Sequence, residues 1–533
     1  MEKQIYIRLL VLIIVLGLAL RLYNLDTESL WIDESFSVQH AAKGTVFNVI
    51  DGVKETEAAP PGYYVFLHSW IQWFGDSADS VRFPSVIFGT LAILVLFLLV
   101  SKLYGFGTAL LASLFLSTSM LQVLYSQEAR IYSLFTLLTL FTVYFFIEII
   151  QREKAGKKCL MWYWLYGISL LASIYTNYLG ILFWFMGAVL FPLFIFWKRK
   201  DLILLKKVIW NWCALHLAVL VLSLPLFPIA KSQYALLHFG LAEILVARGL
   251  PSWLAHMGLW FFILPLLAIF SFLLLLFFID RRRKEAAPER KRLKEIFFLA
   301  LLALSGLFYV YLVINPLQLF GVTLLPTPLT NSYFLIRHSF FLAPLLYIYL
   351  ARKIIALPSR RVLLFVILVI LIINSFSLSW YYAQPTKAEW KEAVHFISSS
   401  ESGNAALVLL DSGGMANTFL LDYYSDGKFR IIPLTWADRA KVGRKLEQLS
   451  SAQVLEIVQG KKEVWLVLSR NQETEDKYKE ILDTFFTNDL YKEFYQIKSY
   501  RYKAMDSDTM DTAPAPKVDL YKRGFMNVWG AYG

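Results

Sequence analysis

The chain has 533 residues, of which 57% are hydrophobic and only 17% are charged, and its mean hydropathy is +0.53. So little polar surface excludes a set of soluble domains, and it also excludes a disordered chain or a disulfide scaffold. The formal net charge is +12, but the basic residues gather in short loops between apolar runs. That distribution is typical of membrane orientation signals, so we expect membrane lipids as partners and no nucleic acid.

Eleven apolar runs approach the length of about 20 residues that a membrane-spanning helix needs. The stretch 162–197 could also be read as one long run. The sequence therefore predicts a polytopic α-helical membrane protein with about 11–13 transmembrane helices. The predicted spans are residues 5–22, 81–103, 107–124, 131–150, 162–178, 179–197, 207–228, 253–279, 295–314, 333–351 and 362–381.

The loops between these spans fall into two alternating sets, with 24 Lys and Arg residues in one set and 8 in the other. Because positive loops mark the cytoplasm, we expect a multi-pass protein of the cytoplasmic membrane with its N-terminus inside. Eleven spans then place the C-terminal part outside. The predicted outer loops are long and rich in aromatic residues and proline, about 23–80, 229–252 and 315–332, so we expect the function on the outer face.

The composition changes near residue 384, which predicts two domains: a transmembrane module of residues 1–383, with a first outer loop of about 23–80, and a soluble extracytoplasmic α/β domain of residues 384–533. The turn Asp411-Ser-Gly-Gly414 is better explained as a tight strand-to-helix turn than as a phosphate cradle. Strands are predicted at 405–411, 430–434 and 464–469, helices at 414–424, 438–458 and 473–486, and a segment that closes the sheet at 490–502.

Two adjacent carboxylates, Asp33 and Glu34, follow Trp31 in the first outer loop. Trp31 suits the membrane interface, so both carboxylates are expected just above the bilayer, where a raised pKa would let one act as a base. Neighbouring side chains on a helix point about 100° apart, so the two would have different roles. A solvated acidic loop is the alternative.

Further polar residues interrupt apolar sequence near the outer face. Glu128 and Arg130, followed by Tyr132, form either a functional turn or an ordinary polar turn with an ion pair. Arg82 and Arg337 open predicted spans, where guanidinium groups could bind lipid phosphate or only extend to headgroups.

Residues 59–70 are too short to cross a membrane and suit an amphipathic helix on its surface. His68 within it is expected to pack or bond locally. No His, Cys or Asp spacing indicates zinc, and no cofactor is predicted. A Mg or Mn ion at Asp33 with Glu34 or Glu128 has no motif to support it.

The ordered set of these motifs resembles a known family, the C-type (GT-C fold) membrane glycosyltransferases of the protein O-mannosyltransferase and aminoarabinose transferase superfamily, similar to glycosyltransferase families 39 and 83. The resemblance is good over residues 1–190, weaker to about 385 and only architectural in the tail. The matching segments are Trp31-Ile-Asp-Glu-Ser35, Pro60-Pro-Gly-Tyr-Tyr64, Arg82-Phe-Pro-Ser85, Glu128-Ala-Arg-Ile-Tyr132, and Arg337-His338 with Pro344.

The resemblance implies transfer of one sugar, hexose or pentose, from a polyprenyl-phosphate donor to a hydroxyl of a lipid, glycan or protein acceptor, with inversion at the anomeric carbon. Asp33 would be the general base, and Glu34 or Glu128 would orient the acceptor or the sugar. The candidate ligands of the donor phosphate are Arg82, Arg130, Arg337 and Lys54, and the candidate residues of the substrate groove are Trp31, Tyr63, Tyr64, His68, Tyr132 and His338.

Three other classes stay open on the sequence. A transporter or flippase of lipid-linked sugars would show repeated halves, broken helices and charges at the membrane midplane. A ligase that moves a whole glycan would favour a larger outer loop late in the bundle. A scaffold without catalysis would leave Asp33 and the outer arginines unexplained.

Overall fold

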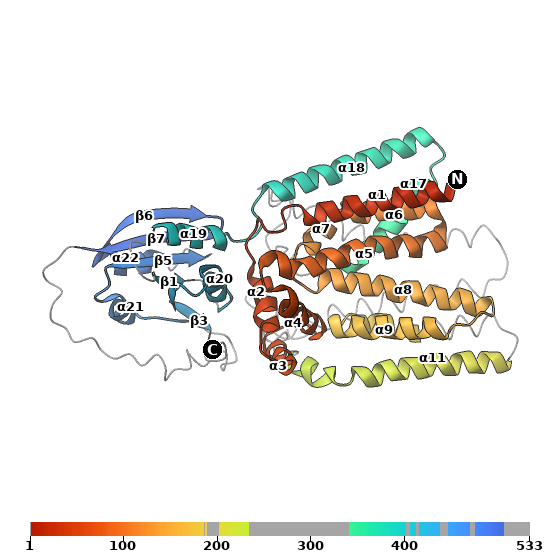
Figure 1. The fold of residues 1–533 in the computed structure, drawn as a ribbon, viewed down its shortest axis with the longest axis horizontal. Coiled ribbons are helices and arrows are strands. Elements are labelled where there is room, and N and C mark those ends of the chain that lie inside the picture. The colour runs from red at the N-terminus through yellow and green to blue at the C-terminus, as the bar shows by residue number, and fades with distance from the viewer. Residues whose placement is uncertain are drawn as a thin grey trace, which may run out of the picture. The chain divides into compact units, whose positions relative to one another are not determined.

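The structure, a computed structural model, describes residues 2–185, 187–188, 202–233, 340–400, 406–411, 415–437, 446–469 and 475–505 (Figure 1). It divides into two compact units. The helical unit comprises Met1–Thr27 and Phe36–Gln384, and the second unit comprises Glu28–Ser35 and Pro385–Gly533. The segment that carries Asp33 and Glu34 therefore belongs to the same unit as the C-terminal part of the chain.

The helical unit is a bundle of long apolar helices, with the shorter α3 and α4 at one end of it (Figure 1). The helix α2 (Ile32–Ala41) begins in the second unit and ends in the helical unit. The remaining helices are α1 (Glu2–Leu22), α3 (Val46–Thr56), α4 (Gly62–Phe74), α5 (Ala78–Tyr104), α6 (Phe106–Thr118), α7 (Met120–Ser126), α8 (Tyr132–Lys154), α9 (Leu160–Thr176), α11 (Leu202–Ser223), α17 (Ala343–Ile355) and α18 (Arg360–Ala383), with a short 3₁₀ turn at Phe340–Leu342.

Four helices of the described part, α1, α5, α8 and α18, are long and apolar enough to cross a membrane. Two bent helix pairs raise the number to six if each pair is one span. These spans, with the α/β unit described below, confirm the predicted fold class of a polytopic helical membrane protein. The predicted spans 253–279 and 295–314 lie outside the described residues, as do most of 179–197 and the first part of 333–351.

The predicted span 107–124 is not one straight helix. Helices α6 and α7 meet at Ser119 with a bend of 59°. The hydroxyls of Ser117 and Thr118 both donate to the carbonyl oxygen of Leu114, at 2.9 Å each. Such bonds back to the preceding turn compete with the backbone ladder and bend helices, which explains the break.

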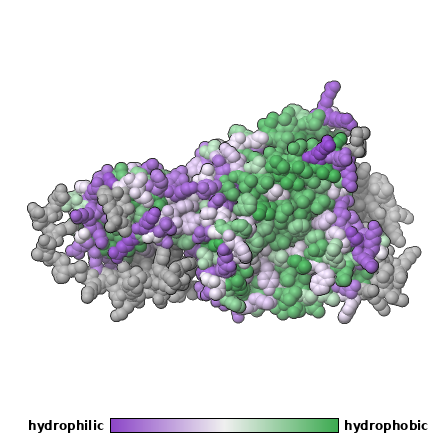
Figure 2. Space-filling view, in the orientation of Figure 1, coloured by the Kyte–Doolittle hydropathy of each residue, from purple (hydrophilic) through white to green (hydrophobic). Residues whose placement is uncertain are grey.

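The outer surface of the helical unit is strongly apolar, as the broad hydrophobic area in Figure 2 shows. Leu12 on α1 and Phe365 and Phe376 on α18 expose between 64% and 69% of their surface. A face of this kind is stable against lipid tails, because the backbone polar groups are satisfied within each helix. The exposed apolar side chains therefore mark the membrane-facing surface of a multi-pass membrane protein.

The second unit contains a five-stranded mixed sheet in the order β2-β1-β5-β7-β6. Strand β1 pairs in parallel with β2 and β5, and β7 pairs antiparallel with β5 and β6. The strands are β1 (Leu407–Asp411), β2 (Arg430–Pro433), β5 (Glu463–Ser469), β6 (Phe486–Phe494) and β7 (Ile497–Ala504), and the helices are α19 (Trp390–Ser400), α20 (Met415–Ser425), α21 (Ser451–Val458) and α22 (Glu475–Asp483).

Apolar side chains on alternate positions of the sheet pack against the helices. Leu466 of β5 joins Val454 of α21 and Leu482 of α22 in one buried cluster. Trp465, the neighbouring residue on β5, points to the opposite face, where its ring lies 5.7 Å from that of Phe396 on α19. Helices thus contribute to the packing of both faces, which agrees with the predicted α/β fold.

The predicted helix over 438–458 is confirmed only over Ser451–Val458, and its earlier described part is wrong. Strand β4 (Leu446–Gln448) pairs antiparallel with β3 (Thr435–Ala437), and helix α21 begins only at Ser451. Ser450 and Gln453 form a capping box, in which each side chain bonds the backbone N–H of the other residue. This cap fixes the helix start, and it could have been recognised from the Ser-x-x-Gln pattern.

Candidate functional site

The most strongly organised polar group of the helical unit centres on Arg130, in the turn between α7 and α8. Its Nη1 and Nη2 atoms donate to the two carboxylate oxygens of Glu57 at 3.0 and 3.2 Å. Nη1 also lies 3.1 Å from the hydroxyl oxygen of Ser37 on α2. Arg130 and Glu57 each expose only 8% of their surface. A paired fork of this kind is strong and directional, so it holds the guanidinium in one orientation.

Aromatic side chains of α4 complete this group. The ring centroid of Tyr64 lies 6.0 Å from the guanidinium carbon of Arg130, and the ring of Tyr63 packs edge-on against Tyr64. Both tyrosines are fully buried. Burial raises the pKa of Tyr64 well above its usual value, although Arg130 acts in the opposite direction. The phenol therefore stays protonated and keeps a hydrogen atom to donate.

Arg82 and Glu128 are buried in the same unit. Arg82, 1% exposed near the start of α5, donates from Nη1 to the carbonyl oxygen of Leu25 at 2.8 Å. Glu128, 6% exposed, lies two residues before Arg130, and its carbonyl oxygen accepts the backbone N–H of Arg130. Arg130 thus pairs with the carboxylate of Glu57, which lies 73 residues away in sequence.

The other predicted groove residues of this unit have different surroundings. Tyr132 opens α8, and its ring lies 4.9 Å from that of Tyr125. Both ring nitrogens of His68 are engaged: Nδ1 lies 2.7 Å from the carbonyl oxygen of Ala41 and Nε2 lies 3.0 Å from the side-chain nitrogen of Gln72. Lys54 is half-buried in the last turn of α3.

Asp33 and Glu34 occupy the first turn of α2, in the second unit. Glu34 is fully buried, and its Oε2 accepts hydrogen bonds from the ammonium of Lys387 at 3.1 Å and from the backbone N–H of Trp31 at 3.3 Å. Asp33 and Trp31 are half-buried. The two neighbouring carboxylates therefore have different environments, because Glu34 is held in a buried ion pair.

The segment before α2 is fastened to the C-terminal part of the same unit. The carboxylate of Glu28 accepts from the backbone N–H and the hydroxyl of Thr386. The backbone N–H of Leu30 donates to the hydroxyl of Tyr424 at 2.6 Å. These bonds, together with the Glu34–Lys387 pair, fix the start of α2 and hence the position of Asp33 within this unit.

Sequence reasoning missed three residues of these groups. Glu57 and Lys387 had no local signal, because their partners are distant in sequence. The sequence predicts no role for Arg21, although the structure buries it completely at the end of α1. A basic residue at the end of an apolar span was the one available hint. Arg337 and His338 lie outside the described residues.

Arg21 joins α1 to the bent pair α6 and α7. Its Nη1 and Nη2 atoms donate to the carbonyl oxygens of Ser117 and Leu116 at 3.2 and 3.3 Å, and Nε donates to the hydroxyl of Ser126 at 3.1 Å. Those carbonyls lie in the last turn of α6, where the break removes their helical partners. A Cβ atom at Gly89 would lie 2.9 Å from Nε, so this close approach requires glycine.

Across the described residues, no three His, Cys, Asp or Glu side chains gather into a group that could hold a metal ion.

A comparison with protein families matches residues 58–229 to the family described as dolichyl-phosphate-mannose-protein mannosyltransferase. The matched segment contains Tyr64, Arg82, Glu128 and Arg130, and it ends near the start of the long undescribed region. This match confirms the resemblance to the C-type membrane glycosyltransferases. A search of the curated proteins finds no matching relative.

Solved structures of similar shape include three membrane glycosyltransferases. The Pmt1–Pmt2 protein O-mannosyltransferase complex of S. cerevisiae, bound to its sugar donor, is 15% identical with a TM-score of 0.36, and the match covers 42% of this chain and 34% of that one. ArnT from Cupriavidus metallidurans is 13% identical with a TM-score of 0.46, covering 92% and 97%. The Archaeoglobus fulgidus oligosaccharyltransferase is 13% identical with a TM-score of 0.47, covering 92% and 72%.

Proposed function

We propose that the chain transfers a single sugar from a polyprenyl-phosphate donor to an acceptor hydroxyl on the extracytoplasmic side of the cytoplasmic membrane, with inversion and with Asp33 as the general base. The observation that carries the proposal is that the family-matched segment holds two buried arginines, Arg82 and Arg130, at the ends of apolar helices. Buried cations beside membrane-spanning helices suit an anionic group on an apolar chain.

The geometry of Arg130 supports phosphate recognition. Its guanidinium holds the two carboxylate oxygens of Glu57, and a phosphate monoester or diester, which offers a similar pair of oxygens, would replace that carboxylate in the same fork. Ser37 of α2 lies beside it. The polyprenyl chain would lie against the apolar faces of the bundle.

The proposed reaction is a direct displacement. The Asp33 carboxylate takes the proton of the acceptor hydroxyl, and the oxygen attacks the anomeric carbon from the face opposite the phosphate. The bond between that carbon and the phosphate oxygen breaks, and polyprenyl phosphate leaves. Arginine side chains stabilise the charge that develops on the leaving phosphate.

The environments of the two carboxylates favour Asp33 over Glu34 as the base. Glu34 is buried in its pair with Lys387, which keeps its carboxylate engaged. We assign Glu34 to positioning the first turn of α2, and Glu128 to orienting the acceptor or the sugar. Asp33 is half-buried and adjacent to this anchor.

The test is sugar transfer by the full-length protein in nanodiscs, with radiolabelled polyprenyl-phosphate sugars of several kinds and a membrane-lipid extract as the acceptor source. A positioned base contributes about 10²–10⁴-fold to the rate. The substitution Asp33→Asn should therefore lower the initial rate by about that factor. Asp26→Asn, an exposed carboxylate of the same loop, is the matched control and should leave the rate unchanged.

A near-normal rate with Asp33→Asn would refute the assignment of the base. A transporter of lipid-linked sugars is the second candidate, because two of the spans are bent by 59° and 57°. Movement of the labelled donor across a proteoliposome bilayer, without transfer of the sugar, would favour that class over the transferase.

A further inference from the structure

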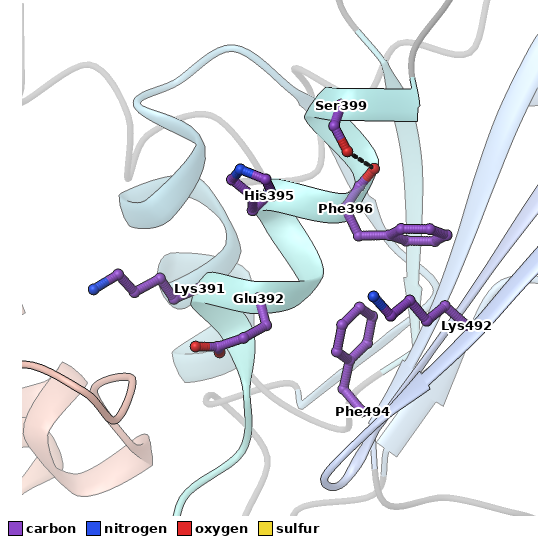
Figure 3. Close-up of a pocket in the computed structure, with 7 residues that line it drawn as sticks. All are labelled: Lys391, Glu392, His395, Phe396, Ser399, Lys492 and Phe494. Carbon is purple, nitrogen blue, oxygen red and sulfur yellow. Dashed lines mark hydrogen bonds between the residues drawn. The ribbon is translucent and has the colours of Figure 1, made fainter.

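An open groove on the second unit lies between helix α19 and strand β6 (Figure 3). It offers about 680 Å³, within the range of about 300–1,000 Å³ that small-molecule sites occupy. The residues that line it are Lys391, Glu392, His395, Phe396 and Ser399 of α19, and Lys492 and Phe494 of β6.

The fold explains why these side chains meet. Lys391, His395 and Ser399 are spaced four residues apart and therefore form one stripe along α19. Lys492 and Phe494 alternate along β6 and share one face of the sheet. Because β6 is the edge strand, the groove forms where α19 meets the margin of the sheet.

Lys492 is prepared to bind an anion. Its ammonium lies 5.2 Å from the ring centroid of Phe396 and 5.1 Å from that of Phe494, and Figure 3 shows it beside both rings. These contacts hold the charge in place but consume none of its three N–H donors. Within the part of the chain that the structure describes, no hydrogen bond or ion pair occupies the Lys492 ammonium.

The other lining groups suit a sugar. Two half-buried phenyl rings offer flat apolar faces to the C–H face of a pyranose. The carboxylate of Glu392 accepts hydrogen bonds, and the side chains of Lys391 and His395 donate them, which matches hydroxyls that do both. Two lysines against one carboxylate leave the groove positively charged.

The groove also adjoins the segment that carries the proposed base. The hydroxyl of Ser29 donates to Oε2 of Glu392 at 3.4 Å, and the backbone N–H of Lys391 donates to the same hydroxyl oxygen at 2.9 Å. Ser29 precedes Asp33 by four residues, and both belong to the second unit.

We propose that this groove binds the saccharide part of the acceptor and that an anionic substituent of that saccharide, a phosphate or a carboxylate, binds the Lys492 ammonium. The inference rests on the proposed glycosyl transfer, because only that reaction makes the bound saccharide an acceptor. The binding of an anionic saccharide can be tested without the donor.

The experiment is a calorimetric titration of the full-length protein in phosphatidylcholine nanodiscs with glucose 6-phosphate, glucose and inorganic phosphate. We expect glucose 6-phosphate to bind more tightly than either of the other two. Lys492→Gln should weaken that binding about tenfold, the effect of one charge-assisted contact. Lys461→Gln, an exposed lysine of the same unit outside the groove, is the matched control and should leave it unchanged.

A second arm adds phosphatidylinositol to the nanodiscs to separate two sources of the same chemistry. Competition with glucose 6-phosphate would identify a lipid-borne saccharide, and its absence would identify a soluble or polymeric glycan. Equal binding of inorganic phosphate and glucose 6-phosphate, equal effects of the two lysine substitutions, or no binding at all would overturn the inference. Sugar transfer without binding in this groove would overturn the inference but leave the proposed function intact. Binding in the groove without any sugar transfer would support the saccharide site and refute the proposed function.

Discussion

Single buried arginines organise the helical unit. Arg130 is neutralised by Glu57, whereas Arg21 donates hydrogen bonds to uncharged oxygens: three backbone carbonyls and one hydroxyl. A charge buried in this way is stable only because its N–H groups are satisfied. The carbonyl oxygens in the last turn of α6 lose their backbone N–H partners at the break, and Arg21 supplies N–H donors in their place.

Replacing Arg21 by methionine tests this role. Arg21→Met keeps an unbranched side chain but leaves the carbonyls of Leu116 and Ser117 without their donor, at about 1–3 kcal/mol for each buried group. We expect a clearly lower melting temperature of the purified protein in detergent. Arg8→Met changes an exposed arginine of the same helix and should have little effect. Equal melting temperatures for both variants would show that the Arg21 bonds are dispensable.

Among the helices and strands, α22 and β7 are connected by a hydrogen-bond network around Glu475. Oε1 of Glu475 accepts from Lys479 at 2.7 Å and from the hydroxyl of Tyr500 at 2.6 Å, and Oε2 accepts from Lys498 at 2.8 Å. Burial alone would raise the pKa of Glu475, but these hydrogen bonds lower it to about 2. The ionised carboxylate therefore stabilises the packing of α22 on the sheet.

This lowered pKa predicts a pH dependence of the second unit. Since the folded pKa lies below the unfolded value of about 4.3, the stabilisation is complete above that value and is lost as the pH falls towards 2. Hydrogen exchange of the peptides that cover α22 and β7, corrected for intrinsic rates, should therefore accelerate between about pH 5 and pH 3.

Glu475→Gln should show the faster exchange already at pH 7 and lose most of the pH dependence. Glu480→Gln, an exposed glutamate of the same helix, is the control and should behave like the unaltered protein. A pH profile that Glu475→Gln leaves unchanged would assign the acid sensitivity to other groups.

Local sequence patterns predicted the helices and strands, whereas contacts between residues that are distant in sequence form the candidate site. The run Val464-Trp-Leu-Val-Leu-Ser469 predicts a buried strand because continuous apolar sequence suits the centre of a sheet, and β5 spans Glu463–Ser469. The break at Ser119 was not predicted, because a hydroxyl that bonds back to its own helix leaves the hydropathy unchanged. Glu57 could not be predicted as the partner of Arg130, since no periodicity relates residues 73 positions apart.

The charged residues of the helical unit lie at its two ends. At one end, Lys102 pairs with Glu148, and Arg352 lies 5.0 Å from the ring centroid of Tyr104. Arg152 likewise lies 4.6 Å from the ring centroid of Trp162. The loops at this end belong to the more basic of the two loop sets, while the buried Arg82 and Arg130 belong to the other.

This separation, read with the preference of positive loops for the cytoplasm, predicts that the loop between α8 and α9 faces inward and the C-terminal unit faces outward. The test uses a background with Cys159→Ser and Cys213→Ser, which removes both natural cysteines. Single substitutions Lys157→Cys and Lys428→Cys, both at exposed positions, are then labelled in intact cells with a membrane-impermeant maleimide.

We expect labelling of Lys428→Cys in intact cells and labelling of Lys157→Cys only after permeabilisation. The opposite pattern would place Asp33 and the groove of the second unit in the cytoplasm. There, nucleotide sugars are available, and a polyprenyl-phosphate donor would no longer be needed to bring an activated sugar to the acceptor. The orientation of the chain thus decides whether the proposed donor is chemically necessary, and the two labelling experiments measure it without any substrate.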